Sequence, residues 1–243
     1  FYTYISTLLY VMRDCAAAGK ELVVLDRINP LGGKIEGGML QPGFESFVGV
    51  YPLTTRYGLT PGEFARLANE EQHIGCTLHV LPVQGWRRKM LFPETGLTWM
   101  MPSPAIPHFE TALLYPGVCL AEATNLSEGR GTSAPFELIG APFINGAALT
   151  TRMNALKLPG VAFTAAYFTP SASKHANQRC EGVHIHLTDT KAFDTIRTGT
   201  ALLYAIREMY SAAFALRQPE NEHALLPINR LTGSDVLAGE WPD

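Results

Sequence analysis

The sequence predicts an α/β fold, in which a mostly parallel sheet flanked by helices is followed by a second, smaller α+β domain. Up to Pro142, strand-like and helix-like segments alternate, which is typical of parallel strands joined by helical crossovers. After Pro142, a helix-like segment precedes two neighbouring strands and a long amphipathic helix. We therefore expect one domain over residues 1–145 and the smaller domain over residues 146–243.

Hydrophobic spacing assigns the elements of the first domain. A helical apolar face over residues 5–12 predicts a helix, and a second helix begins at Thr60, because Thr60 and Glu63 form a capping box with proline between them. Another helix is expected near residues 109–115. Apolar runs predict buried strands at residues 21–26, 77–83, 118–123 and 135–140.

The smaller domain is expected to begin with a helix over residues 146–157. Its two strands are expected at residues 161–169 and 182–187, and a long helix at residues 192–214. Because residues 182–187 alternate apolar and polar side chains, one face of this sheet is expected to be solvated.

Composition excludes several classes of protein. With 47% hydrophobic and 17% charged residues, the chain has the composition of an ordinary globular protein. The net charge is −3 and the densest basic cluster is residues 87–89, so nucleic acid is not an expected partner. No apolar stretch reaches the ~20 residues of a membrane span. The cysteines show no metal-binding spacing and are expected to be buried free thiols, with disulfides as the alternative: Cys15, Cys76, Cys119 and Cys180.

The loop of residues 124–132 is the most informative segment for function. It places Glu128 and Arg130 beside Gly129 and Gly131, two residues that tolerate positive φ. Ligands of open α/β sheets collect beyond the carboxyl ends of strands, where this loop is expected. The loop therefore predicts a ligand site, and the alternative is a structural ion pair that braces a tight turn.

A second loop, residues 26–38, is also expected at the end of a strand. It carries Asp26 and Glu36, and a carboxyl group in a partly dry cleft can serve in acid/base catalysis near neutral pH. The alternative is a solvated loop that caps a helix. Its glycines do not have the GxGxxG spacing, so no dinucleotide cofactor is expected, and no other cofactor is indicated.

Other reactive side chains give weaker signals. His184 and His186 alternate like two metal ligands, but without a third ligand they are interpreted as surface histidines, and no metal is expected. Ser127 would act as a nucleophile only beside a histidine, and no nucleophile-elbow motif occurs. Trp86 and Trp99 lie in Pro- and Gly-rich loops, where aromatic rings either stack on sugars or anchor the loop.

Many ordered motifs along nearly the whole chain resemble one family, the exo-β-N-acetylmuramidases of the NamZ type, long catalogued as a domain of unknown function. The motifs are Phe1-Tyr-Thr-Tyr-Ile, Asp26-Arg-Ile-Asn-Pro-Leu-Gly-Gly, Ile35-Glu-Gly, Phe47-Val-Gly, Tyr57-Gly-Leu-Thr-Pro-Gly-Glu, Gly85-Trp-Arg, Thr95-Gly-Leu-Thr-Trp, Pro102-Ser-Pro, Thr124-Asn-Leu-Ser-Glu-Gly-Arg-Gly-Thr, Pro135-Phe, Arg217-Gln-Pro and Leu231-Thr-Gly-Ser-Asp.

The resemblance implies a glycosidase that removes terminal N-acetylmuramic acid from the non-reducing end of peptidoglycan fragments. It implies a Rossmann-like domain, a smaller α/β domain and a site in the cleft between them, in a periplasmic or secreted protein. Two carboxyl groups would flank the scissile bond. Glu36 matches the glutamate of the family's Glu-Gly-Pro element, and Glu128 and Arg130 match its Ser-Glu-Gly-Arg-Gly-Thr element.

These matches define the expected site. Glu36 and Glu128 are the expected catalytic residues, and Arg130 is expected to bind the lactyl carboxylate of muramic acid. We expect the two loops to converge, so that Glu36 and Arg130 reach one sugar-sized hollow. The full set expected to bind substrate is Asp26, Asn29, Tyr57, Trp86, Asn125, Ser127 and Arg130.

The chain departs from the family pattern at three points. Gly37-Gly38 replaces Gly-Pro, Ala105 replaces an asparagine after Pro-Ser-Pro, and Tyr57 stands where a histidine is usual. The change at Tyr57 removes a titratable imidazole from the expected site.

The first residues, 1–5, already follow a helical pattern, so the chain is expected to be part of a longer protein. The resemblance places a further catalytic glutamate, in a Gly-Pro-Glu-His-Gly motif, before Phe1, and this chain alone is therefore expected to be inactive. One alternative function is a non-catalytic cell-wall sugar-binding protein on the same scaffold. The other is a nucleotide-binding Rossmann enzyme, which the missing phosphate loop disfavours.

Overall fold

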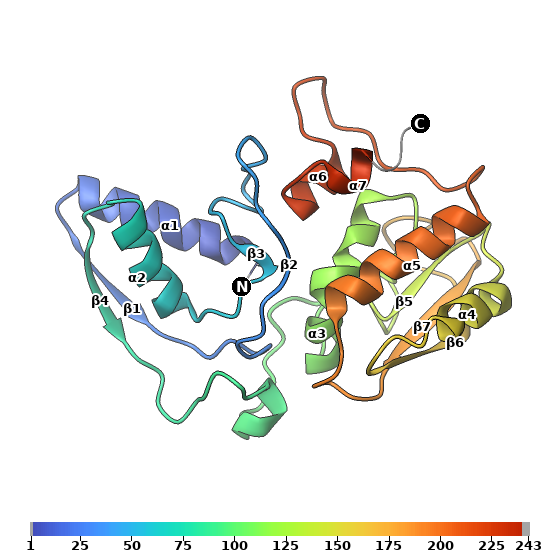
Figure 1. Ribbon diagram of the computed structural model, residues 1–243, viewed down its shortest axis with the longest axis horizontal. Helices are drawn as coiled ribbons and strands as arrows, with labels where there is room; N and C mark the ends of the chain where they lie inside the picture. The colour runs from blue at the N-terminus through green and yellow to red at the C-terminus, as the bar shows by residue number, and fades with distance from the viewer. Residues whose placement is uncertain (1, 240–243) are drawn as a thin grey trace. The chain divides into compact units, whose positions relative to one another are not determined.

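The computed structural model describes residues 2–239, and the chain divides into two compact units, Phe1–Thr98 and Trp99–Asp243 (Figure 1). The expected α/β fold class is confirmed, because the first unit holds a parallel strand pair flanked by helices and the second an antiparallel sheet. The boundary predicted at 145/146 falls inside the second unit, since the strand β5 (Leu138–Ala141) pairs with β7 (Cys180–Leu187). As a result, the second unit is also the longer one.

The first unit is built around the parallel pair β1 (Glu21–Leu25) and β4 (Thr77–Leu81), aligned from Glu21 opposite Thr77 to Leu25 opposite Leu81. The helices α1 and α2 pack against each other and against this pair (Figure 1). The remaining elements are an antiparallel pair and a short 3₁₀ helix. The bounds are α1 (Tyr2–Ala17), β2 (Glu36–Met39), β3 (Thr54–Arg56), α2 (Pro61–Glu71) and η1 (Phe92–Thr95).

The start of α2 is the capping box that the sequence predicts. The hydroxyl of Thr60 accepts a hydrogen bond from the backbone N–H of Glu63 at 3.2 Å, and Glu63 Oε2 accepts one from the N–H of Thr60 at 2.9 Å. Asp26, at the end of β1, accepts from the Thr60 hydroxyl at 2.9 Å and from the N–H of Gly62 at 2.7 Å. A carboxylate at this position also favours the positive end of the helix dipole. The contacts fix the end of β1 to the start of α2.

One face of the β1–β4 pair packs on the helices, and the other face is exposed. Val24 lies in a core cluster with Met12 and Ala65, whereas Val23, Leu25 and Leu81 on the opposite face are 54%, 70% and 56% exposed. Within residues 2–239, β4 is the only strand that pairs with β1. The complete burial expected for the strand at residues 21–26 is therefore not seen in the described part of the chain.

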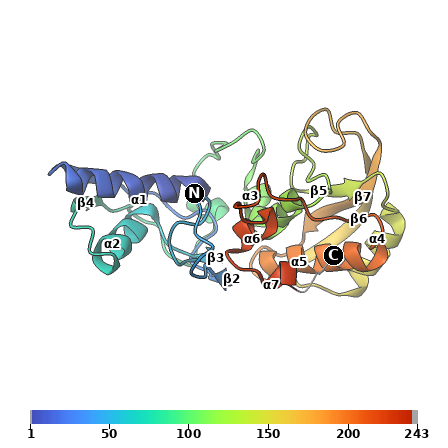
Figure 2. The ribbon, with the colours of Figure 1, turned by 90° about the horizontal axis from the view of Figure 1, so that it is seen from above.

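The second unit contains a three-stranded antiparallel sheet in the order β5-β7-β6. The helix α4 packs on β6 and β7, and α5 contacts α3 and α4 (Figures 1 and 2). The predicted helices and strands of residues 146–214 are present with small shifts in their ends. The bounds are α3 (Phe109–Val118), η2 (Cys119–Ala123), α4 (Gly146–Ala155), β6 (Val161–Phe168), α5 (Thr195–Met209), α6 (Pro227–Thr232) and α7 (Val236–Gly239).

The strand predicted at residues 118–123 is wrong, because this segment is the end of α3 followed by the 3₁₀ helix η2. The whole segment is apolar apart from Glu122, and a short apolar run has the same appearance in a buried strand and in a buried helix. The loop of residues 124–132 therefore follows a helix and not the carboxyl end of a strand.

Two glycines allow α3 and α5 to touch through their backbones. A Cβ atom at Gly199 would lie 2.2 Å from the carbonyl oxygen of Gly117, and a Cβ at Gly117 would lie 1.8 Å from the carbonyl oxygen of Thr195. The Thr195 hydroxyl accepts from the N–H of Gly117 at 3.0 Å and donates to the carbonyl of Leu114 at 2.8 Å. These bonds satisfy backbone groups on either side of Pro116, which has no N–H to donate to the helical ladder of α3.

We expect Gly199→Ala to destabilise the protein by about 1–3 kcal/mol, because a methyl group there overpacks two backbones that cannot move apart freely. Thermal or denaturant unfolding measures the change. Gly239→Ala is the matched control, since Gly239 is also helical and a Cβ there meets nothing within 4 Å. Equal stability of the two variants would contradict the close contact.

Candidate active site in the second unit

Glu128 is the centre of a buried charge network in the second unit. Its side chain is 3% exposed, and each carboxylate oxygen contacts a different cation. Oε1 lies 3.3 Å from Nε of Arg130, and Oε2 lies 2.9 Å from Nζ of Lys174. A buried carboxylate needs such pairing, because its unpaired burial costs several kcal/mol.

Arg130 is held on two sides and exposed on a third. Its Nε and Nη2 atoms donate to Oε1 of Glu122, at 3.3 and 2.8 Å, and its guanidinium lies 5.0 Å from the ring centre of Phe136. Burial opposes the charged form, but the hydrogen bonds and charge of Glu122, with the charge of Glu128, raise the Arg130 pKa. The side chain is 38% exposed, and Nη1 makes no hydrogen bond within residues 2–239. The exposed side of the guanidinium can therefore bind an anionic ligand from solvent.

The backbone of the loop makes this arrangement possible. Gly129 and Gly131 adopt φ of 75° and 79°, as the sequence predicts. A Cβ at Gly131 would lie 2.4 Å from the backbone nitrogen of Ala172, so this glycine permits a close approach to the segment between β6 and β7. The group that Gly131 approaches closely is therefore protein backbone.

Sequence reasoning missed Glu122 and Lys174. Lys174 Nζ donates to the carbonyl of Ala121 at 2.7 Å and to the carbonyl of Thr124 at 3.0 Å, besides its ion pair with Glu128. Burial lowers the Lys174 pKa, and the charge and hydrogen bond of Glu128 oppose this shift. No local pattern marks either residue. Lys174 lies far along the sequence from Glu128, and Glu122 lies in the segment that was predicted to be a strand.

Asn125 and Ser127, which were expected to bind substrate, use their side chains inside the fold. The Asn125 side chain donates to the carbonyl of Ala213 at 2.8 Å and accepts from the N–H of Ala215 at 3.1 Å. The hydroxyl of Ser127 is buried and accepts from the N–H of Gly129 at 3.2 Å. Both residues therefore shape the loop around Glu128.

Glu36, the other expected catalytic residue, lies in the first unit and is also ion-paired on both oxygens. Oε2 accepts from Nη1 of Arg56 at 2.8 Å, and Oε1 contacts Nζ of Lys34. Glu36 and Arg56 are cross-strand partners in the β2–β3 pair, and both side chains are buried. The expected convergence of positions 36 and 130 involves both units and stays a prediction.

Among the other residues expected to bind substrate, Asp26 caps α2, as described above. Asn29 is buried, donating to the carbonyl of Leu59 at 2.9 Å and accepting from the N–H of Leu31 at 3.0 Å. These contacts give both residues structural roles in the loop of residues 26–38.

The two aromatic residues of the expected site differ from each other. Tyr57 packs against the core cluster that contains Ile5 and Phe64, and burial raises its pKa above the ordinary value. Trp86 is half-buried, and its indole N–H has no hydrogen-bond partner within residues 2–239. The indole nitrogen of Trp86 is itself buried, so this donor is not open to solvent.

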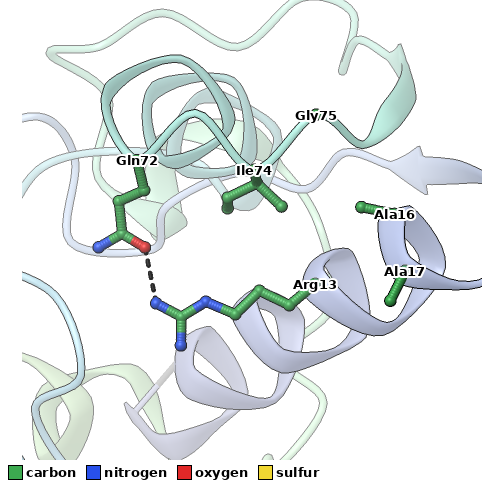
Figure 3. A pocket seen from close by; sticks show the side chains of 6 residues that line it. All are labelled: Arg13, Ala16, Ala17, Gln72, Ile74 and Gly75. Atoms are coloured by element: carbon green, nitrogen blue, oxygen red, sulfur yellow. Dashed lines mark hydrogen bonds between the residues drawn. The ribbon is translucent and has the colours of Figure 1, made fainter.

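One hollow of the first unit contains none of the expected site residues. It has a volume of about 630 Å³ and lies between the ends of α1 and α2, where Arg13 donates to Gln72 at 2.8 Å (Figure 3). Its other lining residues are Ala16, Ala17, Ile74 and Gly75. The lining consists of small side chains and of an arginine that is already hydrogen-bonded to Gln72. It therefore offers no group of polar side chains that could bind a ligand together.

The histidines of β7 belong to a cluster around Glu137. His184 Nε2 lies 3.6 Å from Oε2 of Glu137, and His108 Nε2 lies 3.3 Å from Oε1. The rings of His184 and His186 are 4.2 Å apart, and His186 Nε2 is 2.8 Å from the hydroxyl of Thr164. Burial and the neighbouring His184 lower the His186 pKa, opposed by Glu137. The histidines are thus half-buried with polar partners, not isolated on a solvated face.

All four cysteines are free thiols, as expected. Three of them are buried as expected, whereas Cys15 is only partly buried. Within residues 2–239, no three His, Cys, Asp or Glu side chains form a group that could hold a metal ion. In the same residues, no helix is long and apolar enough to cross a membrane.

The lowered His186 pKa predicts a pH dependence of stability. The unfolded chain binds this proton more readily, with a pKa of 6.5, so folding is weakened as the pH falls through 6.5. We expect the drop in Tm between about pH 7.5 and 5.5 to be smaller in His186→Gln than in the wild type. His223→Gln is the control, since His223 is 88% exposed. An equal drop in the wild type and both variants would contradict the prediction.

Comparison with known proteins places the chain in a family. Residues 1–110 match the family model described as exo-beta-N-acetylmuramidase NamZ, N-terminal, and residues 113–240 match the corresponding C-terminal model. The chain is 46% identical over 215 residues to the peptidoglycan beta-N-acetylmuramidase NamZ of Bacillus subtilis (strain 168). That match covers 88% of this chain and 52% of the relative, so the chain spans about half the length of the curated relative.

Two solved structures from Bacteroides fragilis NCTC 9343, both of DUF1343 family proteins, are also similar. The match to one of them has a TM-score of 0.89 at 32% identity, and it covers 98% of this chain and 62% of that chain. The other has a TM-score of 0.70 at 24% identity, covers 98% of this chain and 63% of its own, and shows the fold alone. Because the two family models together span almost all of it, the chain belongs to the exo-β-N-acetylmuramidase NamZ family.

Proposed function

We propose that the intact protein is a glycosidase that releases terminal N-acetylmuramic acid from the non-reducing end of peptidoglycan fragments. Membership of the NamZ family and the name of the Bacillus subtilis relative support this activity. The observation in this chain that carries the proposal is Arg130, a half-exposed guanidinium held in place by Glu122 and Glu128.

Arg130 is suited to recognise the group that distinguishes muramic acid from glucosamine, the lactyl carboxylate. A planar guanidinium binds a carboxylate through two parallel hydrogen bonds, which lysine cannot reproduce. Glu122 occupies one edge of Arg130, and Nη1 is available at another. The fixed guanidinium needs little ordering when an anionic ligand binds, and this favours affinity.

Glu36 and Glu128 remain our candidates for the two carboxyl groups that glycoside hydrolysis requires. Each is buried with a cation on each oxygen, so the substrate must displace or share a cation to reach the carboxylate.

A second candidate function is a non-catalytic protein that binds cell-wall sugars on the same scaffold. The same pairing favours it, because a carboxylate engaged on both oxygens is not open to act as an acid or a nucleophile. A chromogenic muramide assay and a binding assay on the intact protein separate the two functions. Turnover supports the glycosidase, and binding without turnover supports the sugar-binding protein.

If the intact protein is a glycosidase, Glu36→Gln and Glu128→Gln should each lower kcat by about 10²–10⁴-fold, the usual contribution of an acid/base group. Glu208→Gln is the control, since Glu208 forms an exposed ion pair with Arg152. Unfolding curves must accompany the assay, because removing one partner of a buried ion pair is destabilising. Folded variants with wild-type kcat would remove these residues from catalysis.

Arg130→Lys should reduce the preference for muramoyl over glucosaminyl substrates on the order of 10²-fold, because a desolvated carboxylate loses its bidentate partner. The ratio of kcat/KM values for the two substrates measures the effect. Arg152→Lys, in which an exposed arginine that pairs with Glu208 is replaced, should leave the ratio unchanged. An unchanged ratio in Arg130→Lys would exclude Arg130 from recognition of the lactyl group.

A further inference from the structure

The loop between β6 and β7 is attached to the loop of residues 124–132 at three points. Ser171 donates to the carbonyl of Gly131 through its N–H at 2.9 Å and through its hydroxyl at 2.8 Å. Lys174 reaches Glu128, and Nε2 of His175 lies 2.6 Å from the carbonyl oxygen of Asn125. Figure 2 shows the β6–β7 loop extending beyond the ends of its strands.

This β6–β7 loop has an uncommon backbone. Ser173, His175 and Asn177 adopt φ of 68°, 57° and 61°, the left-handed region that non-glycine residues rarely occupy. Such conformations persist only where surrounding contacts impose them, and they concentrate at functional sites. The contacts of Ser171 and His175 impose them here, with Lys174 between these two residues.

The contacts of Lys174 do more than neutralise a charge. Nζ of Lys174 donates hydrogen bonds to two backbone carbonyls, and it forms an ion pair with Oε2 of Glu128 at 2.9 Å. The carbonyls of Ala121 and Thr124 at the end of η2 fix where Nζ lies. Because Nζ then holds Oε2, the other oxygen of Glu128 is directed to Nε of Arg130.

A further charged residue, Arg217, lies near Lys174. Arg217 donates to the carbonyl of Glu122 at 3.5 Å, and its charge lowers the Lys174 pKa further. Arg130 and Lys174 thus pair with the carboxylates of this site, whereas Arg217 reaches only the backbone of Glu122.

We propose that Lys174 is a positioning residue for muramoyl recognition, which aims the Arg130 guanidinium by fixing the orientation of Glu128. This inference rests on the proposed function. The Lys174 side chain is 21% exposed and its Nζ is engaged by two carbonyls and by Glu128, so its effect on recognition passes through Glu128 and Arg130.

The test measures kcat/KM of the intact protein for muramoyl and glucosaminyl substrates in Lys174→Met and Lys174→Arg. We expect Lys174→Met to lower the muramoyl preference on the order of tenfold, mainly through a higher KM for the muramoyl substrate. Lys174→Arg, which keeps the charge, should lose less of the preference. Lys157→Met, at an exposed lysine near the end of α4, is the control and should leave the preference unchanged.

A merely structural lysine would lower the rates for both substrates together, by reducing the folded fraction, and would leave their ratio unchanged. An unchanged ratio in Lys174→Met, while Arg130→Lys lowers it, overturns the proposal and leaves the proposed function standing. An unchanged ratio in Arg130→Lys overturns the proposed recognition, and the role of Lys174 with it. If Lys174→Met does not fold, Lys174→Gln, which also removes the charge, takes its place, and wild-type preference there overturns the proposal.

Discussion

The compensation of a buried carboxylate, Glu128, is the constraint on which the loops of the second unit depend. Taking an ionised carboxylate out of water costs several kcal/mol unless oppositely charged groups and hydrogen bonds replace the solvent. Arg130 supplies one cation from two residues along the chain, and Lys174 supplies the other from the loop between β6 and β7. The same lysine donates to carbonyls at the end of η2. Lys174 therefore links the end of η2, the loop of residues 124–132 and the loop between β6 and β7.

Glu36 in the first unit meets the same constraint in the same way. One of its cations, Lys34, comes from two residues away, and the other, Arg56, comes from the partner strand. A cross-strand ion pair also fixes the register of two very short strands. In both units, therefore, a carboxylate proposed for chemistry is part of the scaffold, and a ligand must compete with resident cations to reach it.

The sequence predicted those features that depend on neighbouring residues. The capping box at Thr60 and the positive φ of Gly129 and Gly131 follow from local rules, and both are present. The segment 118–123 was misassigned because an apolar run does not distinguish a helix from a strand when both are buried. The role of Lys174 could not be predicted for another reason. A lysine in a polar loop carries no local signal, and only the fold brings it to Glu128.

The backbone contact between Gly117 and Gly199 has a consequence for how this unit can change during evolution. The clash at either glycine is with main-chain atoms, so shortening a neighbouring side chain cannot make room for a larger residue. A substitution at one position is relieved only if the two helices separate, which would also break the bonds of Thr195 to α3. The spacing of α3 and α5 can therefore change only if the two glycines and the contacts of Thr195 change together.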